Sequence, residues 1–130
     1  MINTYTYLAS PYTAPDVHTM ELRALGATRA AHWLLTQRHW VYSPIVHCHD
    51  LAKTFSLPRE HEYWEEYNQA MLRGASDLVV LTIAGWRESR GVQAEITYAQ
   101  KLGHPTRLLR IQGFAYHFAD MNGNGQVAVA

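Results

Sequence analysis

The chain has 130 residues, 48% hydrophobic and 17% charged, a composition that suits one compact domain with a buried core. Eleven basic residues balance eleven acidic ones. This balance argues against binding a nucleic-acid polymer or an anionic membrane, because both attract basic surfaces. The single cysteine excludes an internal disulfide. No segment has the length of a membrane-spanning helix or the pattern of a signal peptide, so we expect a cytoplasmic protein.

Apolar runs and helical spacings alternate along the chain. Strands are predicted at Thr4–Ala9, Trp40–Ser43, Leu78–Ile83 and Thr106–Ile111, and helices from Pro15-Asp16 to about Leu35, from Glu62 to Gly74 and from Ser89 to Leu102. The segment Ile45–Pro58 reads as a loop with one helical turn, and residues 119–130 read as a loose tail. The alternation predicts an α/β fold. We expect a single-domain, flavodoxin-like or Rossmann-like three-layer sandwich with a four- or five-stranded parallel sheet.

A sheet of this kind binds ligands beyond the carboxyl ends of its strands. Three segments follow predicted strands and are therefore expected to meet there: Ser10–Thr13, Ser43–Asp50 and Ala84–Gly91. Glycine-rich dinucleotide and Walker-type phosphate motifs are absent from the sequence, which disfavours dinucleotide oxidoreduction and phosphoryl transfer.

The segment between the strongest strand and its following helix carries candidate ligand contacts. Ser89 suits an N-cap, and Gly91 lets a ligand approach the backbone amides of the first turn. Such amides favour an anion such as phosphate, although a capped helix without a ligand has the same pattern. Glu95 lies about two turns into the helix, beside the apolar Val92 and Ala99. It is either a nucleophile or acid–base group, or a solvent-facing carboxylate.

Two further groups of residues have a chemical and a structural interpretation. The cluster His47-Cys48-His49-Asp50 contains metal-ligand types, but no second compact ligand pair follows. We therefore expect no metal and interpret the segment as pocket wall, with His47 either a ligand contact or a surface histidine. Tyr12 and Trp86 are candidates for stacking on a base, or ordinary core aromatics. Trp33, Trp40 and Trp64 are assigned to packing or to a dimer interface.

Several motifs occur together in a fixed order. They are Tyr7-Leu8-Ala9-Ser10-Pro11-Tyr12, Asp77-Leu78-Val79-Val80-Leu81, Gly85-Trp86, Ser89-x-Gly91-Val92-x-x-Glu95, Ala99 and Gly103-His104-Pro105. In order and spacing they resemble the nucleoside 2-deoxyribosyltransferase-like superfamily, over roughly Tyr5 to Arg110. Within it, the chain is most similar to small bacterial and phage proteins with a G-W-x-x-S-x-G pattern, and it is also similar to deoxynucleoside monophosphate N-glycosidases.

The resemblance implies a mechanism. Glu95 matches the family glutamate that attacks the anomeric carbon of the sugar, and water or a second base then resolves the glycosyl-enzyme. Tyr7 matches the tyrosine that positions this carboxylate. A carboxylate beside the sugar also stabilises an oxocarbenium-like transition state. The resemblance implies no cofactor. It implies a homodimer or higher homo-oligomer, because family members complete their sites from a neighbouring subunit, a part that Met121-Asn122 could play here.

Two positions distinguish this chain within the superfamily. Relatives that act on free nucleosides carry an aspartate at the place of Ser89, whereas those that hydrolyse deoxynucleoside monophosphates carry serine, so a 5′-monophosphate is the favoured substrate. Many relatives also carry an aspartate near the departing base, where this chain has Asn68 or Gln69. An amide cannot act as a general acid. Another group must substitute (Asp50, Glu62, Glu66 or a histidine), or turnover is weak or lost.

The sequence therefore predicts cleavage or transfer at the N-glycosidic bond of a nucleoside or nucleotide, with hydrolysis of a monophosphate favoured. A nucleotide-binding sensor that has lost turnover is the alternative. The expected catalytic residues are Glu95 and Tyr7. The expected substrate contacts are Ser10, Pro11, Tyr12, Ser43, His47, Asn68, Asp77, Trp86, Ser89 and Gly91.

Overall fold

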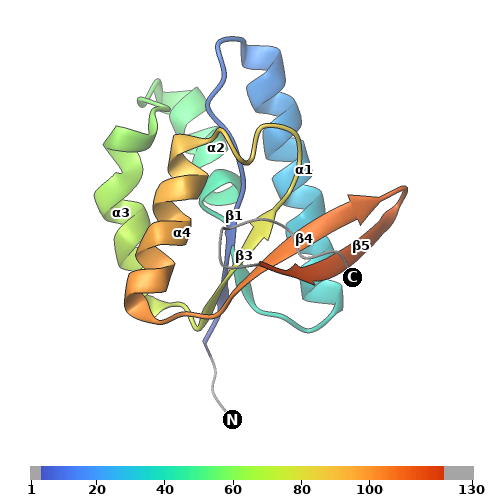
Figure 1. Cartoon of the computed structure of the whole chain (residues 1–130). Coiled ribbons are helices and arrows are strands. Elements are labelled where there is room, and N and C mark those ends of the chain that lie inside the picture. The colour runs from blue at the N-terminus through green and yellow to red at the C-terminus, as the bar shows by residue number, and fades with distance from the viewer. Residues whose placement is uncertain (1–3, 122–130) are drawn as a thin grey trace.

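A computed structural model describes residues 4–121. Five strands form one sheet in the order β2-β1-β3-β4-β5, flanked by four helices (Figure 1). The strands are β1 (Thr6–Ala9), β2 (Val41–Tyr42), β3 (Asp77–Leu81), β4 (Thr106–Gln112) and β5 (Ala115–Asp120). The helices are α1 (Val17–Thr36), α2 (Pro44–Phe55), α3 (His61–Gly74) and α4 (Arg90–Leu102). The predicted α/β sandwich is confirmed: four of the strands are parallel, as predicted, whereas β5 is antiparallel to β4.

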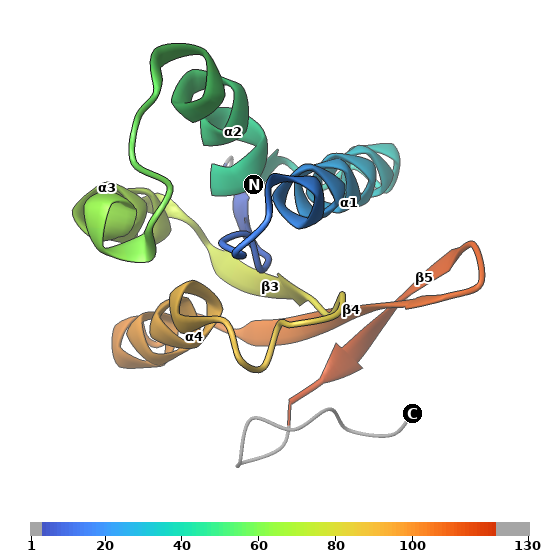
Figure 2. The ribbon, with the colours of Figure 1, turned by 90° about the horizontal axis from the view of Figure 1, so that it is seen from above.

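The buried strands divide the core by the two-residue period of their side chains. Tyr7, Leu78 and Val80 point to the face covered by α3 and α4, where they pack with Leu72, Val92 and Ile96. Leu8, Val79 and Leu81 point to the opposite face, where Ala30 and Leu34 of α1 cover them. Figure 2 shows this arrangement from above, with α1 and α4 on opposite sides of the sheet. Both faces of β1 and β3 are therefore buried, as the continuous apolar sequence of β3 predicts.

Local signals in the sequence explain where helices α1 and α4 begin and end. The carboxylate of Asp16 accepts a hydrogen bond from the Thr19 amide at 2.8 Å and caps α1. Ser89 caps α4 by accepting from the Val92 amide at 3.2 Å. Helix α4 ends at Gly103, whose φ of 77° is a left-handed conformation that suits glycine. The predicted limits of both helices are confirmed to within two residues.

The structure corrects two predictions. Residues 44–55 form helix α2, not a loop, because Ser43 accepts from the Val46 amide at 3.1 Å and Pro44 occupies the first helical position. Pro44 ends the strand but also starts the helix. Residues 115–120 form β5, a strand that was not predicted, and pair antiparallel with β4; residues 119 and 120 fall in the segment predicted to be a loose tail. Tyr116 and Phe118 alternate along β5 and pack on Trp33, which provides the burial that this strand needs.

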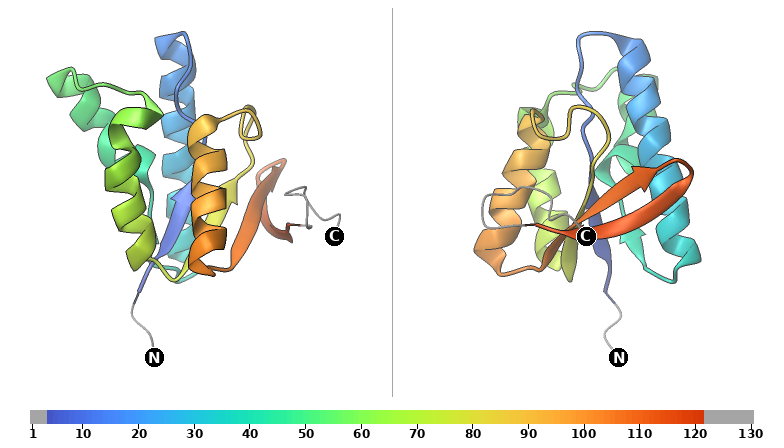
Figure 3. Two further views of the ribbon diagram at one scale, coloured as in Figure 1. Left: turned by 60° about the vertical axis from the view of Figure 1, so that its left-hand side comes forward. Right: turned by 45° about the vertical axis from the view of Figure 1, so that its right-hand side comes forward.

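Helix α2 continues past the end of the sheet (Figure 3). It extends beyond the carboxyl-terminal edge, and residues 56–60 then carry the chain across to the start of α3 (Figure 3). The amino ends of α2, α3 and α4 all lie at this edge. Met121 packs against the core on the α4 side, while Asn122 lies outside the described residues. Within residues 4–121, no helix combines the length and apolar character needed to cross a membrane.

Candidate active site

A buried hydrogen bond joins the first strand to the last helix. The Tyr7 hydroxyl donates to Oε2 of Glu95, although 88 residues separate the two in the sequence. Tyr7 pairs with Leu78 across the β1–β3 ladder and points to the face covered by α4. Glu95 is only 9% exposed, so the solvent-facing interpretation of this carboxylate is wrong. The structure brings together the two residues predicted to be catalytic.

Burial controls the protonation of this pair. Desolvation raises the pKa of Glu95 to about 7, and the hydrogen bond from Tyr7 opposes this rise. Desolvation and the neighbouring carboxylate raise the pKa of Tyr7 well above its ordinary value. The phenol therefore stays protonated and donates, while the carboxyl group exchanges its proton near neutral pH. Such perturbed groups are frequent at functional sites.

Because the Glu95 carboxylate is disfavoured by burial, its ionisation costs folding free energy. The penalty is absent below the ordinary glutamate pKa of 4.5 and is complete above about pH 7. We predict that the free energy of unfolding of Glu95→Gln at pH 8 exceeds that of the wild type by about 3 kcal/mol. This difference should disappear near pH 4.5. Urea unfolding at both pH values measures it. A difference that does not depend on pH would contradict the buried carboxylate.

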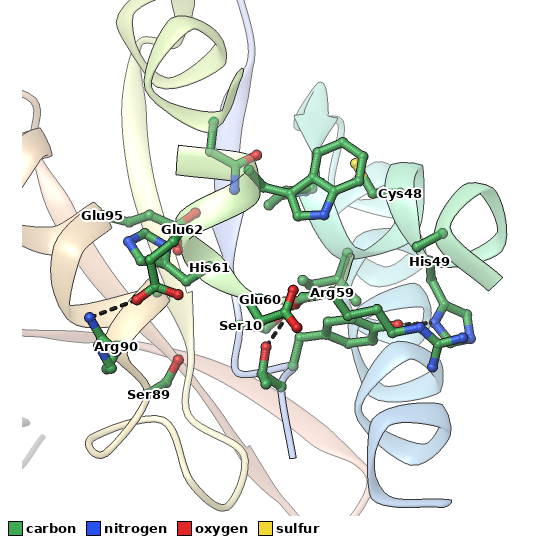
Figure 4. A pocket seen from close by; sticks show the side chains of 18 of the residues that line it. Ser10, Cys48, His49, Arg59, Glu60, His61, Glu62, Ser89, Arg90 and Glu95 are labelled. Carbon is green, nitrogen blue, oxygen red and sulfur yellow. Dashed lines mark hydrogen bonds and ion pairs between the residues drawn. The ribbon is translucent and has the colours of Figure 1, made fainter. Parts of the chain in front are cut away.

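Glu95 lines a cavity of about 380 Å³ at the carboxyl edge of the sheet. The three segments expected to meet there all contribute: Ser10, Tyr12 and Thr13 after β1, one side of α2, and Glu88–Gly91 before and within α4. Residues 59–62 and the first turns of α3 close the remaining side. In Figure 4, Glu95 and Ser89 lie on one side of the pocket, whereas Cys48 and His49 lie on the other. A cavity thus lies where the sequence predicts a ligand site.

The amino end of α4 is open to the cavity. Ser89 and Gly91 both line it, and a side chain at Gly91 would meet the His61 ring at 3.5 Å. The absence of a side chain at Gly91 leaves the first-turn amides accessible to a ligand. Arg90 does not enter the cavity as a free cation, because its guanidinium pairs with Glu62 at 2.6 Å.

Two polar atoms of the cavity wall lack partners in the structure. Among the described residues, the Ser10 hydroxyl and Oδ1 of Asn68 are buried without a hydrogen bond. Both residues line the cavity. A buried polar atom without a partner costs free energy, and a bound ligand removes that cost when it supplies the partner. Ser10 and Asn68 therefore mark two places where a polar ligand would be held.

Five of the predicted substrate contacts do not line the cavity. Pro11 and Trp86 are buried in the interior, and Trp86 packs with the core on the α4 side. The Ser43 hydroxyl caps α2, and His47 lies on the exposed side of α2 with its ring stacked on Tyr67 at 6.0 Å. Asp77 begins β3 at the opposite edge of the sheet, where it accepts a hydrogen bond from Thr6 at 2.7 Å.

Other residues enter the site that the sequence interpretation did not select. Arg59 lines the cavity, and so does Trp64, for which the sequence predicts a role in packing or at a dimer interface. Trp64 Nε1 donates to the Pro58 carbonyl at 2.8 Å, which holds its ring at the start of α3. His49 also faces the cavity, because α2 turns His47 and His49 to different sides, whereas a strand would keep them together. The helical spacing of Ile45, Cys48, His49 and Ala52 was the available signal.

Arg23 of α1 lies between two loops of the site. Its guanidinium donates to the Thr13 carbonyl at 2.8 Å. It also lies over Gly85, where an added Cβ would come within 2.4 Å of Nη2. Gly85 has a φ of 95°, which also favours glycine. One side chain thus bonds to the loop after β1 and lies beside the loop after β3.

The described residues offer no group of three or more histidine, cysteine, aspartate or glutamate side chains arranged to hold a metal ion. Cys48 is free, and burial raises the pKa of its thiol to about 11. The thiolate is therefore scarce at neutral pH, and Cys48 is a poor nucleophile. Glu95 is the better candidate for covalent chemistry in this cavity.

The fold and the site together define a three-layer α/β protein with a buried tyrosine–glutamate pair at the wall of a cavity. Residues 4–110 match the family model described as "Domain of unknown function (DUF1937)". The match covers most of the chain, which therefore belongs to this family. No curated protein matches the chain.

Proposed function

We propose that this protein cleaves the N-glycosidic bond of a nucleoside 5′-monophosphate, with Glu95 as nucleophile. The observation that carries the proposal is the hydrogen bond from Tyr7 to a buried Glu95 that lines the cavity. The sequence resemblance to the nucleoside 2-deoxyribosyltransferase-like superfamily supports it, because the two residues that meet are those the resemblance pairs. The expected location is the cytoplasm, with the nucleotide pool as the source of substrate.

The chemistry follows from the pair. A Glu95 carboxylate oxygen attacks the anomeric carbon, and the bond to the base breaks with its electron pair on the base nitrogen. Tyr7 donates to Oε2 and fixes the direction of attack. In the second step, water attacks the anomeric carbon and releases Glu95. Two displacements retain the configuration of the sugar. A second base in place of water would make the reaction a transfer.

The phosphate is proposed to bind at the amino end of α4. The Ser89 hydroxyl and the amides near Gly91 provide neutral donors and a favourable helix dipole, and the unpartnered Ser10 hydroxyl is a further donor. Asn68 is proposed to contact the base, since its amide group can donate to or accept from a base edge. We also propose that the protein forms a homodimer or higher homo-oligomer, which light scattering would test.

Ser89→Asp provides a test of phosphate recognition. Aspartate caps a helix as well as serine does, so folding is retained, but its charge repels a phosphate. We predict a fall of roughly tenfold or more in the ratio of kcat/KM for a 5′-monophosphate to that for its nucleoside. Ser89→Asn is the matched control, because asparagine caps the helix without charge. If Ser89→Asp leaves the ratio unchanged, the phosphate does not lie at this end of the cavity.

The test of the proposed function is direct. Purified protein is incubated with ribo- and deoxyribonucleosides and with their 5′-monophosphates, and free base is followed by chromatography. Release from monophosphates in preference to nucleosides is expected.

Asn68 favours a second candidate function, a nucleotide-binding sensor without turnover. By the resemblance, Asn68 or Gln69 stands where many relatives carry an acid, and the buried Oδ1 of Asn68 suits binding more than proton transfer. Ligands that raise the melting temperature without any release of base would establish the sensor and contradict the enzyme.

A further inference from the structure

Four side chains form a hydrogen-bonded chain that reaches the cavity from α1 and α2. The Tyr12 hydroxyl contacts Nδ1 of His49 at 2.7 Å. Nε2 of His49 contacts Oε2 of Glu21, and Lys53 donates to Oε1 of the same carboxylate at 2.7 Å. Tyr12 and His49 line the cavity that Glu95 also lines, and His49 lies across it from Glu95 (Figure 4).

The hydrogen bonds between these four side chains determine which atoms carry protons. Hydrogen bonds from Lys53 and then from His49 lower the pKa of Glu21, which is therefore a carboxylate and only accepts. His49 Nε2 must then carry a proton. Nδ1 faces Tyr12 and either accepts from its hydroxyl, when the ring is neutral, or donates to it, when the ring is cationic. The Tyr12–His49 contact is satisfied in both protonation states, as in a proton relay.

A purely structural role explains the Glu21–Lys53 ion pair but not the Tyr12–His49 contact. Glu21 and Lys53 are partly exposed, at 37% and 55%, and such a pair stabilises a fold only slightly. His49 is different, because its side chain is only 11% exposed and both of its ring nitrogens contact polar groups, the Tyr12 hydroxyl and the Glu21 carboxylate. Tyr12 is in contact with the same cavity that would hold the leaving base.

The other groups that could replace the missing acid are less suitable. Asp50 and Glu66 are exposed and do not line the cavity. Glu62 is paired with Arg90 at 2.6 Å. His61 lines the cavity on the α3 side, but its pairing with Glu65 is long, at 3.5 Å, and that carboxylate is 50% exposed, compared with 37% for Glu21. Near Tyr12 lie Arg59, Cys48 and Asp50, of which Arg59 and Cys48 share the cavity wall.

We propose that the Tyr12–His49–Glu21 chain is the proton donor to the departing base, an inference that rests on the proposed N-glycosidase function. As the C1′–N bond breaks, its electron pair stays on the base nitrogen, which takes the Tyr12 hydroxyl proton. Tyr12 takes a proton from Nδ1 of a cationic His49, which becomes neutral. In the second step water attacks C1′, its proton passes to Tyr12, the Tyr12 proton returns to Nδ1, and the bonding electrons return to Glu95. Nucleotide and water become free base and sugar phosphate.

The proposal is tested by how the rate of base release depends on the leaving base in the wild type and in variants of the relay. The substrates are the monophosphate that releases base fastest and the same nucleotide with an activated base, either N7-methylated if it is a purine or 5-nitro-substituted if it is a pyrimidine. The activated base departs with little need for a proton. Base release is followed over a single turnover, so that the second step does not enter. Thermal unfolding of every variant is recorded alongside.

Tyr12→Phe and His49→Asn are each expected to slow release of the ordinary base about a hundredfold or more and release of the activated base less than about threefold. In His49→Asn the activated substrate should also leave a glycosyl adduct on Glu95, detectable by intact mass, because the second step lacks its proton acceptor. His32→Asn and Tyr116→Phe make the same chemical changes on the exposed side of α1 and on β5 and should change neither rate.

Each other outcome decides against the relay. Equal losses with both substrates would show that the chain only holds the cavity wall, and unchanged rates would show that the proton comes from elsewhere. If His49→Asn does not fold, Tyr12→Phe carries the test, since it keeps the aromatic ring and removes only the hydroxyl. Failure of the wild-type protein to release any base overturns the proposed function itself, and it is recognised before any variant is compared.

Discussion

Glu95→Gln is expected to abolish release of base, lowering the single-turnover rate by about a thousandfold or more. Glutamine keeps the size of the side chain and still accepts a hydrogen bond from Tyr7, but its amide oxygen cannot form the glycosyl-enzyme. Binding should survive, because the cavity and its polar wall are unchanged. The measurement is free base by rapid quench, together with the shift in melting temperature that the nucleotide causes.

The matched control is Glu66→Gln, the same replacement at an exposed position of α3 outside the cavity. It should leave the rate within about twofold of the wild type. Substantial turnover in Glu95→Gln would exclude Glu95 as the nucleophile, even if the protein proves to be an N-glycosidase. Mass spectrometry of acid-quenched wild-type protein should in turn locate a glycosyl group on Glu95.

Tyr7→Phe is expected to reduce the rate roughly ten- to a hundredfold at pH 7 and to move the pH profile. Glu95 must be ionised to attack, so kcat/KM should rise with pH through the Glu95 pKa of about 7. The Tyr7 hydrogen bond lowers that pKa. Without it, the rising limb should shift to higher pH. With the activated-base substrate, whose release does not need a proton from His49, part of the lost rate should return in alkaline solution.

The pH–rate profile separates this role from simple packing. Tyr7→Phe leaves the aromatic ring in the core, so a loss of rate with an unchanged limb would mean that the hydroxyl does not control the ionisation of Glu95. Tyr116→Phe, which removes a hydroxyl from β5, should have the profile of the wild type. Because Tyr7 is fully buried, the melting temperature of Tyr7→Phe must be recorded at each pH.

The sequence predicts the fold well because its signals are local. The apolar run at Leu78, the serine cap at Ser89 and the glycine at Gly103 each act within a few residues and indicate one element. Helix α2 was missed because its starting signal, Ser43-Pro44, was interpreted only as the end of a strand. Strand β5 was missed because its stability comes from pairing with β4 and from packing on Trp33, which no local pattern reveals.

The residues of the candidate site were predicted only in part. The resemblance paired Tyr7 with Glu95, and the structure places them in contact. Asp77 belongs to the same motifs, yet the direction of β3 puts it at the opposite edge of the sheet from the cavity. The contact between Tyr12 and His49 depends on how α2 leaves the sheet, and periodicity within one segment does not contain that information.

The position of Arg23 limits which substitutions this sequence can accept in evolution. It occupies the space beside Gly85 and donates to the carbonyl of Thr13, next to Tyr12. A side chain acquired at position 85 would displace the guanidinium, and the loop that carries Tyr12 would lose its hydrogen bond. Mutations at 85, 23 and 12 should therefore be epistatic: their effects should not add, and the order in which they arise should decide which are tolerated.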